Sequence, residues 1–117
     1  MGFEKDIQAR TRQFAVRVLG VVRALPQDTI GLTVGRQIAK SGTSVGANIE
    51  EAQGAQTKRE FSRKMSIARG EMFETRYWLR LMVEAKLLPA RRLKGLIEES
   101  DELVRILTAI VKRSRGG

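Results

Sequence analysis

Apolar residues recur every three or four positions along most of the chain, which is the spacing of one face of an α-helix. Three stretches interrupt this pattern: residues 25–28 and 87–90, each with a proline, and the glycine-containing stretch 54–57. Helices tend to end just before a proline. The pattern therefore predicts four helices, over residues 4–24, from about 29 to 53, over 58–86, and from 90 to about 113.

Residues at the start of the second and third segments favour these boundaries. Asp28 or Thr29 can cap the second helix, and Thr57 with Glu60 three residues later forms a capping box for the third. Loops of a few residues between long helices favour antiparallel neighbours. We therefore expect an all-α protein, an antiparallel up-and-down four-helix bundle that forms one domain over residues 1–117.

The second predicted helix is rich in glycine, which is a poor composition for an isolated helix. Four glycines fall within it: Gly31, Gly35, Gly42 and Gly46. The pattern leaves two alternatives, close packing of the helix backbone or a break near residues 41–46. A phosphate-binding loop at 41–46 is disfavoured, because the Gly-Lys-Ser/Thr ending and the preceding strand are both missing.

The third predicted helix carries two apolar stripes. One holds Phe61, Met65, Ala68, Met72, Thr75, Leu79 and Met82, and the other holds Ile67, Gly70, Glu74, Trp78 and Leu81. A surface helix needs only one apolar face, so this helix is either central or in contact with another subunit. We predict a homo-oligomer with Ile67, Trp78 and Leu81 at its interface.

The composition of the chain excludes several classes of functional site. The chain has 22 Lys and Arg against 13 Asp and Glu, a net charge of +9, and neither cysteine nor histidine. Disulfides, Cys/His zinc sites and a histidine general base are therefore excluded. No stretch has the roughly 20 apolar residues of a membrane span, and the first 12 residues lack the apolar core of a signal peptide. We expect a cytoplasmic protein without a membrane partner, whose charge either attracts polyanions or only maintains solubility.

The acidic residues offer little for catalysis. Glu71 and Glu74 form an E-x-x-E pair, but di-iron bundles use Glu-x-x-His motifs. Glu74 falls in an apolar stripe, where a carboxylate needs a partner such as Arg36 or Lys40, with Asn48 as a further hydrogen-bond donor. A structural role is favoured over a magnesium-dependent nuclease, so we expect no enzyme, no metal and no cofactor.

Arginines carry the functional prediction. Three project from one side of the third helix, two more lie one turn apart near its start, and the last residues of the chain are basic. The candidate nucleic-acid contacts are Arg59, Arg63, Arg69, Arg76, Arg80, Lys112, Arg113 and Arg115. Such a set predicts contacts to the phosphate backbone with weak sequence specificity. Tyr77 could stack on bases, whereas Trp78 is expected to pack in the core or in the subunit interface.

Two motifs support a resemblance that covers nearly the whole chain. The run 36–52 contains Gln37, the segment Ser41–Ser44 and Ala47–Asn48 followed by a glutamate, and the run 71–79 reads E-x-x-E-T-x-Y-W-L. Together they resemble the family of proteins encoded in intervening sequences of 23S ribosomal RNA genes. The resemblance implies a four-helix bundle, a homopentamer and no established enzymatic activity.

A relative of that family extends these expectations. It is the accessory variability determinant of diversity-generating retroelements, a basic pentamer that works with a reverse transcriptase and nucleic acid. The resemblance implies an accessory role with RNA or DNA, with a reverse transcriptase as a candidate partner. It also implies a buried polar network of Asn48, Glu51 and Glu74, joined by Arg36, while Gly70 replaces a residue that is often basic in relatives. The alternative is a protein-interaction scaffold that docks an acidic partner.

Overall fold

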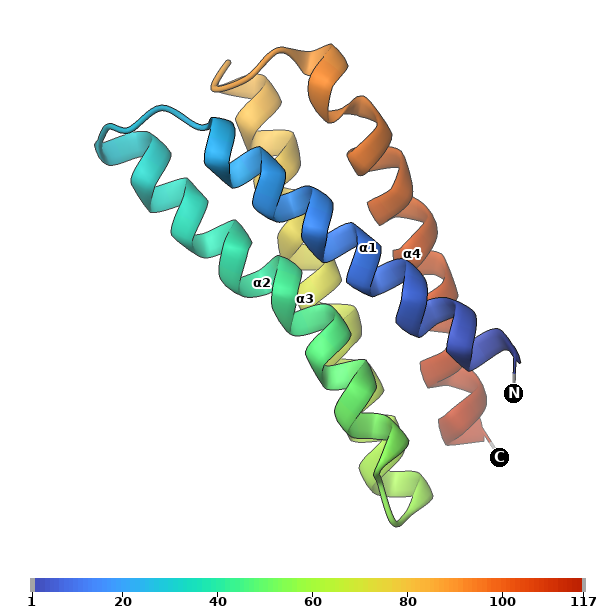
Figure 1. The fold of residues 1–117 in the computed structure, drawn as a ribbon. Helices are drawn as coiled ribbons and strands as arrows, with labels where there is room; N and C mark the ends of the chain where they lie inside the picture. The colour runs from blue at the N-terminus through green and yellow to red at the C-terminus, as the bar shows by residue number, and fades with distance from the viewer. Residues whose placement is uncertain (1, 117) are drawn as a thin grey trace.

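Four antiparallel helices make up the protein in the computed structural model, which describes the backbone of residues 2–116 and the side chains of residues 6–116. They are α1 (Gly2–Ala24), α2 (Thr29–Gln53), α3 (Lys58–Glu84) and α4 (Ala90–Gly116). They form an elongated bundle of 46 × 22 × 20 Å, in which the start of α3 and the end of α4 lie at the same end as the start of α1 (Figure 1). The predicted all-α four-helix bundle is confirmed.

Local capping sets the helix boundaries. The Asp28 side chain accepts a hydrogen bond from the Gly31 backbone N–H (2.9 Å), and the Thr57 hydroxyl accepts one from the Glu60 N–H (3.0 Å). The Glu60 carboxylate accepts from the N–H of Gln56 at 3.3 Å. These contacts satisfy N–H groups that a helix start leaves without partners. Beyond α3, Lys86 has a left-handed φ of 57°, which turns the chain away from the helix axis.

The glycine-rich helix α2 is continuous, so the alternative of a break near residues 41–46 is wrong and close packing is confirmed. A Cβ atom added at Gly42 would lie 2.9 Å from Cγ1 of Val18 on α1. One at Gly46 would lie 3.5 Å from the Thr11 hydroxyl, again on α1. The contact between α1 and α2 therefore offsets the low helix propensity of these glycines.

The core lies along the axis of the bundle and contains the predicted first stripe of α3. Its largest fully buried side chains are Ile7, Phe14, Val18, Ile38, Ile49, Met65, Met72, Leu79, Met82, Leu93, Leu103 and Leu107. One polar pair crosses it, since the hydroxyls of Ser41 on α2 and Thr75 on α3 are hydrogen-bonded at 2.9 Å. This buried pair joins the two helices at one register.

Helix α4 runs three residues further than predicted, to Gly116. The Ser114 hydroxyl donates to the Val111 carbonyl (2.9 Å), and the Arg115 guanidinium donates to the Ser66 hydroxyl on α3 (3.0 Å). The last turn of α4 is therefore helical through residues 114–116, and a side-chain contact joins it to α3.

Candidate nucleic-acid interface

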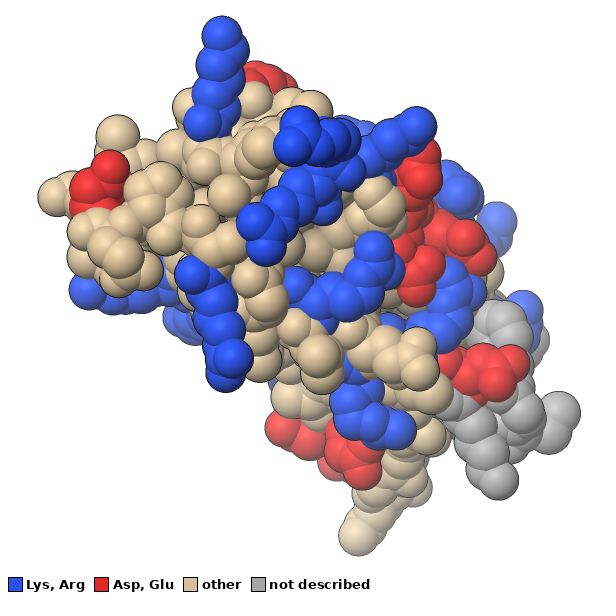
Figure 2. Space-filling model, turned by 45° about the horizontal axis from the view of Figure 1, so that its top comes forward, with Lys and Arg blue, Asp and Glu red and all other residues tan. Residues whose placement is uncertain are grey.

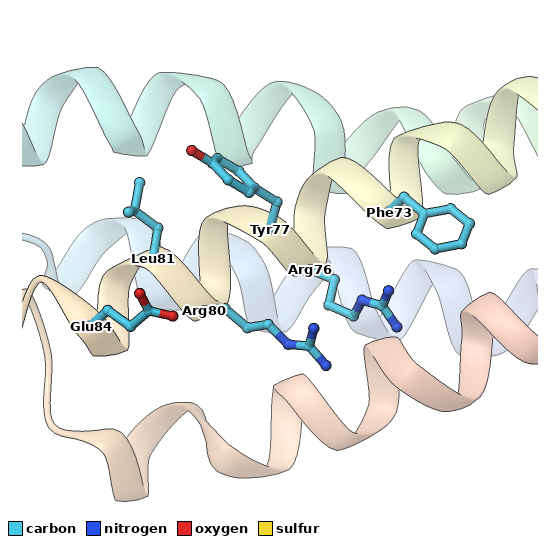
Figure 3. Close-up of a pocket in the computed structure, with 6 residues that line it drawn as sticks. All are labelled: Phe73, Arg76, Tyr77, Arg80, Leu81 and Glu84. Atoms are coloured by element: carbon cyan, nitrogen blue, oxygen red, sulfur yellow. The ribbon is translucent and has the colours of Figure 1, made fainter.

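The predicted arginine row on α3 is partly neutralised. Arg76 and Arg80 both contact the Asp101 carboxylate on α4, with nitrogen–oxygen distances of 3.0 and 3.3 Å. Figure 3 shows both guanidiniums pointing toward α4, while Tyr77 and Leu81 project to the other side of α3. These two ion pairs connect α3 to α4, and the assignment of Arg76 and Arg80 as nucleic-acid contacts stays a prediction.

Arg69, the third member of the row, is also engaged. Its Nε donates to the Thr108 hydroxyl on α4 at 2.8 Å, and its guanidinium lies 5.1 Å from the ring centre of Phe73. Arg76 lies 5.0 Å from the same ring. Phe73 is 37% exposed and lies between two cations, an interleaving of aromatic and basic residues that the sequence reasoning missed.

A basic hollow lies where α3 begins and α4 ends. It has a volume of about 440 Å³ and is lined by Lys58, Arg59, Ser62, Arg63, Ser66, Ser114 and Arg115. We call it the end hollow. None of the described residues that line it is acidic. The structure therefore brings together three of the predicted contacts, Arg59, Arg63 and Arg115.

A second hollow of about 420 Å³ lies beside the first, and Arg115 lines both. Its other lining residues are Arg69, Thr108, Val111, Lys112 and Gly116. Within the described part of the chain, no carboxylate lines this hollow either. Arg113 is exposed in the last turn of α4 and lines neither hollow. On the face shown in Figure 2, lysine and arginine cover much of the surface and carboxylates form smaller groups.

The predicted buried network of Arg36, Asn48, Glu51 and Glu74 is wrong for the single chain. Asn48 donates to the Ser44 carbonyl of its own helix (2.8 Å), and Glu51 forms an ion pair with Lys64.

Arg36 and Glu74 also lie outside any such network, since both are exposed. Glu74 accepts from the indole N–H of Trp78 at 3.1 Å. Over residues 6–116, no hydrogen bond or ion pair joins the four predicted side chains. The buried link between α2 and α3 is instead the pair Ser41 and Thr75, and its signal in the sequence was a hydroxyl residue at a core position of each helix.

The pKa of the Glu71 carboxyl group is raised above its ordinary value. Burial raises it first, the neighbouring Glu74 carboxylate raises it further, and Lys40 opposes both effects. In the part of the chain that the structure describes, no three Asp and Glu side chains are grouped closely enough to hold a metal ion. The E-x-x-E pair is therefore a local electrostatic feature of α3.

Arg10 joins α1 to α4, a contact that the sequence reasoning missed. Its guanidinium lies 2.8 Å from the Glu99 carboxylate and 3.1 Å from that of Glu102. The hydrogen bond to Glu99 is the main cause that raises the pKa of Arg10 above its ordinary value. Because α1 packs mainly on α2, these two ion pairs add a polar connection between α1 and α4.

The predicted interface residues lie on one side of α3. Ile67, Trp78 and Leu81 are each partly buried within the chain, and the Trp78 ring packs against the core. Tyr77 is 57% exposed and contacts Trp78 edge to face, with ring centres 4.9 Å apart. The assignment of this side to a subunit interface stays a prediction.

Comparison with known proteins gives a consistent result. A model of the family described as 23S rRNA-intervening sequence proteins matches residues 4–109. A solved structure from Bacteroides thetaiotaomicron, described as a protein of unknown function from the S23 ribosomal protein family, is 32% identical. The match covers 94% of this chain and 98% of that one, with a TM-score of 0.87.

Three further findings bear on function. A search of curated proteins gave no match, and neither the family nor the solved structure is described as an enzyme. None of the helices, over the residues that could be assessed, is both long and apolar enough to cross a membrane.

Proposed function

The chain belongs to the 23S rRNA-intervening sequence protein family, and from this premise we propose that it is a non-enzymatic, cytoplasmic accessory protein that binds RNA or DNA as a homo-oligomer. The family description names a gene location, so the proposal depends on the charge arrangement of this chain. A reverse transcriptase is the candidate protein partner.

The observation that supports this proposal is the pair of adjacent hollows at one end of the bundle. No carboxylate lines them among the residues described. The six cations that line them are Lys58, Arg59, Arg63, Arg69, Lys112 and Arg115. Elsewhere on α3, Arg76 and Arg80 share Asp101. An arginine without an acidic partner gains more from a phosphate, because no existing ion pair has to be broken.

This arrangement favours contacts to the phosphate backbone. Arginine and lysine neutralise phosphates and release condensed counterions, so affinity falls steeply with salt. Phosphate contacts position a protein without reading sequence. A homo-oligomer would repeat the basic end in every subunit, and several weak contacts to one strand would then combine.

The test is the salt dependence of binding to a labelled oligonucleotide, measured by fluorescence anisotropy between 50 and 200 mM salt. The test variant is Arg59→Gln with Arg63→Gln. The control is Arg23→Gln with Arg36→Gln, which removes the same charge from exposed positions outside both hollows.

We expect steep salt dependence for the natural protein. Loss of two phosphate contacts should reduce the slope of log K against log salt by about 1.4–1.8, and the control should change it little. Absence of binding at low salt, or equal effects of the two variants, would refute the proposal. Capture of an acidic protein that survives nuclease treatment would then favour the scaffold alternative.

A further inference from the structure

We propose that the end hollow is a binding site for a dianionic phosphate group, and that the end of a nucleic-acid strand supplies this group. The second part rests on the proposed function, whereas the first part does not. The site lies between the first turns of α3 and the last turn of α4, at the end of the bundle where α1 begins (Figure 1).

The charges that line the end hollow are all positive. Lys58, Arg59 and Arg63 come from three positions in the first two turns of α3, and Arg115 comes from α4. Within residues 6–116 none of the four forms an ion pair with a carboxylate. Four cations around about 440 Å³ repel one another, and an anion that enters this space relieves that repulsion.

Arg115 is held in place for such a ligand. Its Nη2 donates to the Ser66 hydroxyl at 3.0 Å, which orients the guanidinium across the gap between α3 and α4. Ser66 accepts in this bond, so its own O–H remains able to donate to a phosphate oxygen. The contact therefore prepares two donors, the guanidinium and the hydroxyl.

Ser62 supplies an independent indication of a ligand. Its side chain is 7% exposed and lines the end hollow. Its hydroxyl oxygen is the one buried side-chain polar atom in the described residues without a hydrogen-bond partner. Such an atom costs about 1–3 kcal/mol when left unsatisfied, so a buried polar group without a partner needs an explanation, and a bound water, ion or ligand is one of them. Because this oxygen is shielded from solvent, a phosphate oxygen in the hollow can accept its proton only after a small shift of the surrounding side chains.

The number of cations favours a terminal phosphate over a backbone phosphodiester. A phosphate monoester carries a charge of about −1.5 to −2 at pH 7, because its second pKa is about 6. A diester carries one negative charge and is flanked by two sugars. The monoester therefore interacts more strongly with converging guanidiniums and fits more easily into a site between two helices.

The first experiment tests the site alone with inorganic phosphate. Sodium phosphate is titrated at constant ionic strength against sodium chloride, and the backbone amide signals of residues 58–66 and 114–115 are followed by NMR. We expect saturable shifts that Arg59→Gln with Arg63→Gln abolishes and Arg23→Gln with Arg36→Gln preserves. Shifts that do not saturate, or that both variants preserve, would overturn the site.

The second experiment tests the strand end as the source of the phosphate. Two 3′-labelled single-stranded oligonucleotides differ only in a 5′-phosphate or a 5′-hydroxyl. We expect the phosphate to tighten binding at least about tenfold at pH 7, as expected for one charge-assisted hydrogen bond. The difference in affinity between the two oligonucleotides, which we call the 5′-phosphate increment, should shrink below about pH 6, where the monoester takes up a proton. The charged side chains that line the site are Lys58, Arg59, Arg63 and Arg115.

Ser62→Ala separates binding from folding. It removes an unsatisfied buried hydroxyl, so the free protein should be as stable as the natural one or more stable, while the 5′-phosphate increment falls several-fold. A loss of stability together with an unchanged increment would assign Ser62 a structural role and refute its place in the site.

The outcomes separate the two proposals. Equal affinity for the two oligonucleotides with steep salt dependence would overturn the strand-end assignment and leave the proposed function in place. Saturable phosphate shifts without oligonucleotide binding would support the site with free phosphate as its ligand and refute the proposed function.

Discussion

Replacement of Gly42 by alanine tests the close packing of α1 on α2. An added Cβ would lie 2.9, 3.2 and 3.3 Å from three side-chain carbons of Val18. Valine is stiff about χ1, so its branched Cβ cannot turn away, and the two helices must separate slightly. Overpacking of this kind costs about 1–3 kcal/mol, while exchange of glycine for alanine within a helix contributes about 1 kcal/mol of stability. The net expectation is a loss of up to about 2 kcal/mol.

Two other glycines provide matched controls. Gly20 has open space around the position of a Cβ, so Gly20→Ala should stabilise the protein by about 0.5–1 kcal/mol. At Gly46 the nearest atom would be 3.5 Å away, an ordinary contact, so Gly46→Ala should fall between the other two. From most to least stable, the expected order of the variants is therefore Gly20→Ala, Gly46→Ala and Gly42→Ala.

Urea unfolding followed by the fluorescence of Trp78, the single tryptophan, measures these differences. All variants are compared at one protein concentration, because self-association would make stability depend on it. The double variant Gly42→Ala with Val18→Ala should be more stable than the sum of the single effects, since the new methyl group occupies the space that Val18 leaves. If Gly42→Ala is as stabilising as Gly20→Ala, the close approach of α1 and α2 is refuted.

Three further predictions concern polar contacts. Burial raises the pKa of Glu71, so its ionisation destabilises the fold as the pH rises above the ordinary glutamate value. At pH 7 the urea concentration at the unfolding midpoint should therefore be higher for Glu71→Gln than for the natural protein. At about pH 3.5, where both side chains are uncharged, the two midpoints should be equal. Asp101→Asn releases two arginines and should lower the free energy of unfolding in urea by up to about 1 kcal/mol. The same change should tighten oligonucleotide binding and steepen its salt dependence, both measured by fluorescence anisotropy. Unchanged binding would contradict the release of these arginines for phosphate contacts. Thr75→Val leaves the buried Ser41 hydroxyl without its interhelical partner and should lower the free energy of unfolding by about 1–3 kcal/mol. A second change, Ser41→Ala, should restore part of this loss. If the double variant is less stable than Thr75→Val alone, the stabilising role of the Ser41–Thr75 hydrogen bond is refuted.

Helix boundaries were predictable because they depend on local chemistry. Pro26, Pro89, Asp28 and Thr57 act on the backbone within a few residues, and the observed helices begin and end beside them. The error at the end of α4 has a tertiary cause. The contact from Arg115 to Ser66 joins residues 49 positions apart, and no local signal in the last turn predicts it.

The glycines of α2 show why propensity alone left two alternatives. Helix propensity disfavours the segment around Gly42, and only the position of Val18 on another helix decides that the segment stays helical. The predicted polar network failed for a related reason. Glu74 was placed in an apolar stripe by spacing, but the face of α3 that holds Met72 and Thr75 is buried and leaves Glu74 exposed.

The location of the basic end follows from the antiparallel pairing of α3 with α4. The acids of α4 lie in its first half, at residues 98–102, and residues 103–116 contain none. Antiparallel packing puts the acidic half beside the second half of α3, where Asp101 pairs with Arg76 and Arg80. The half without acids then lies beside the start of α3, where Arg59 and Arg63 have no described carboxylate partner. The order of charges along α4 thus determines which arginines hold the bundle together and which are available to a phosphate.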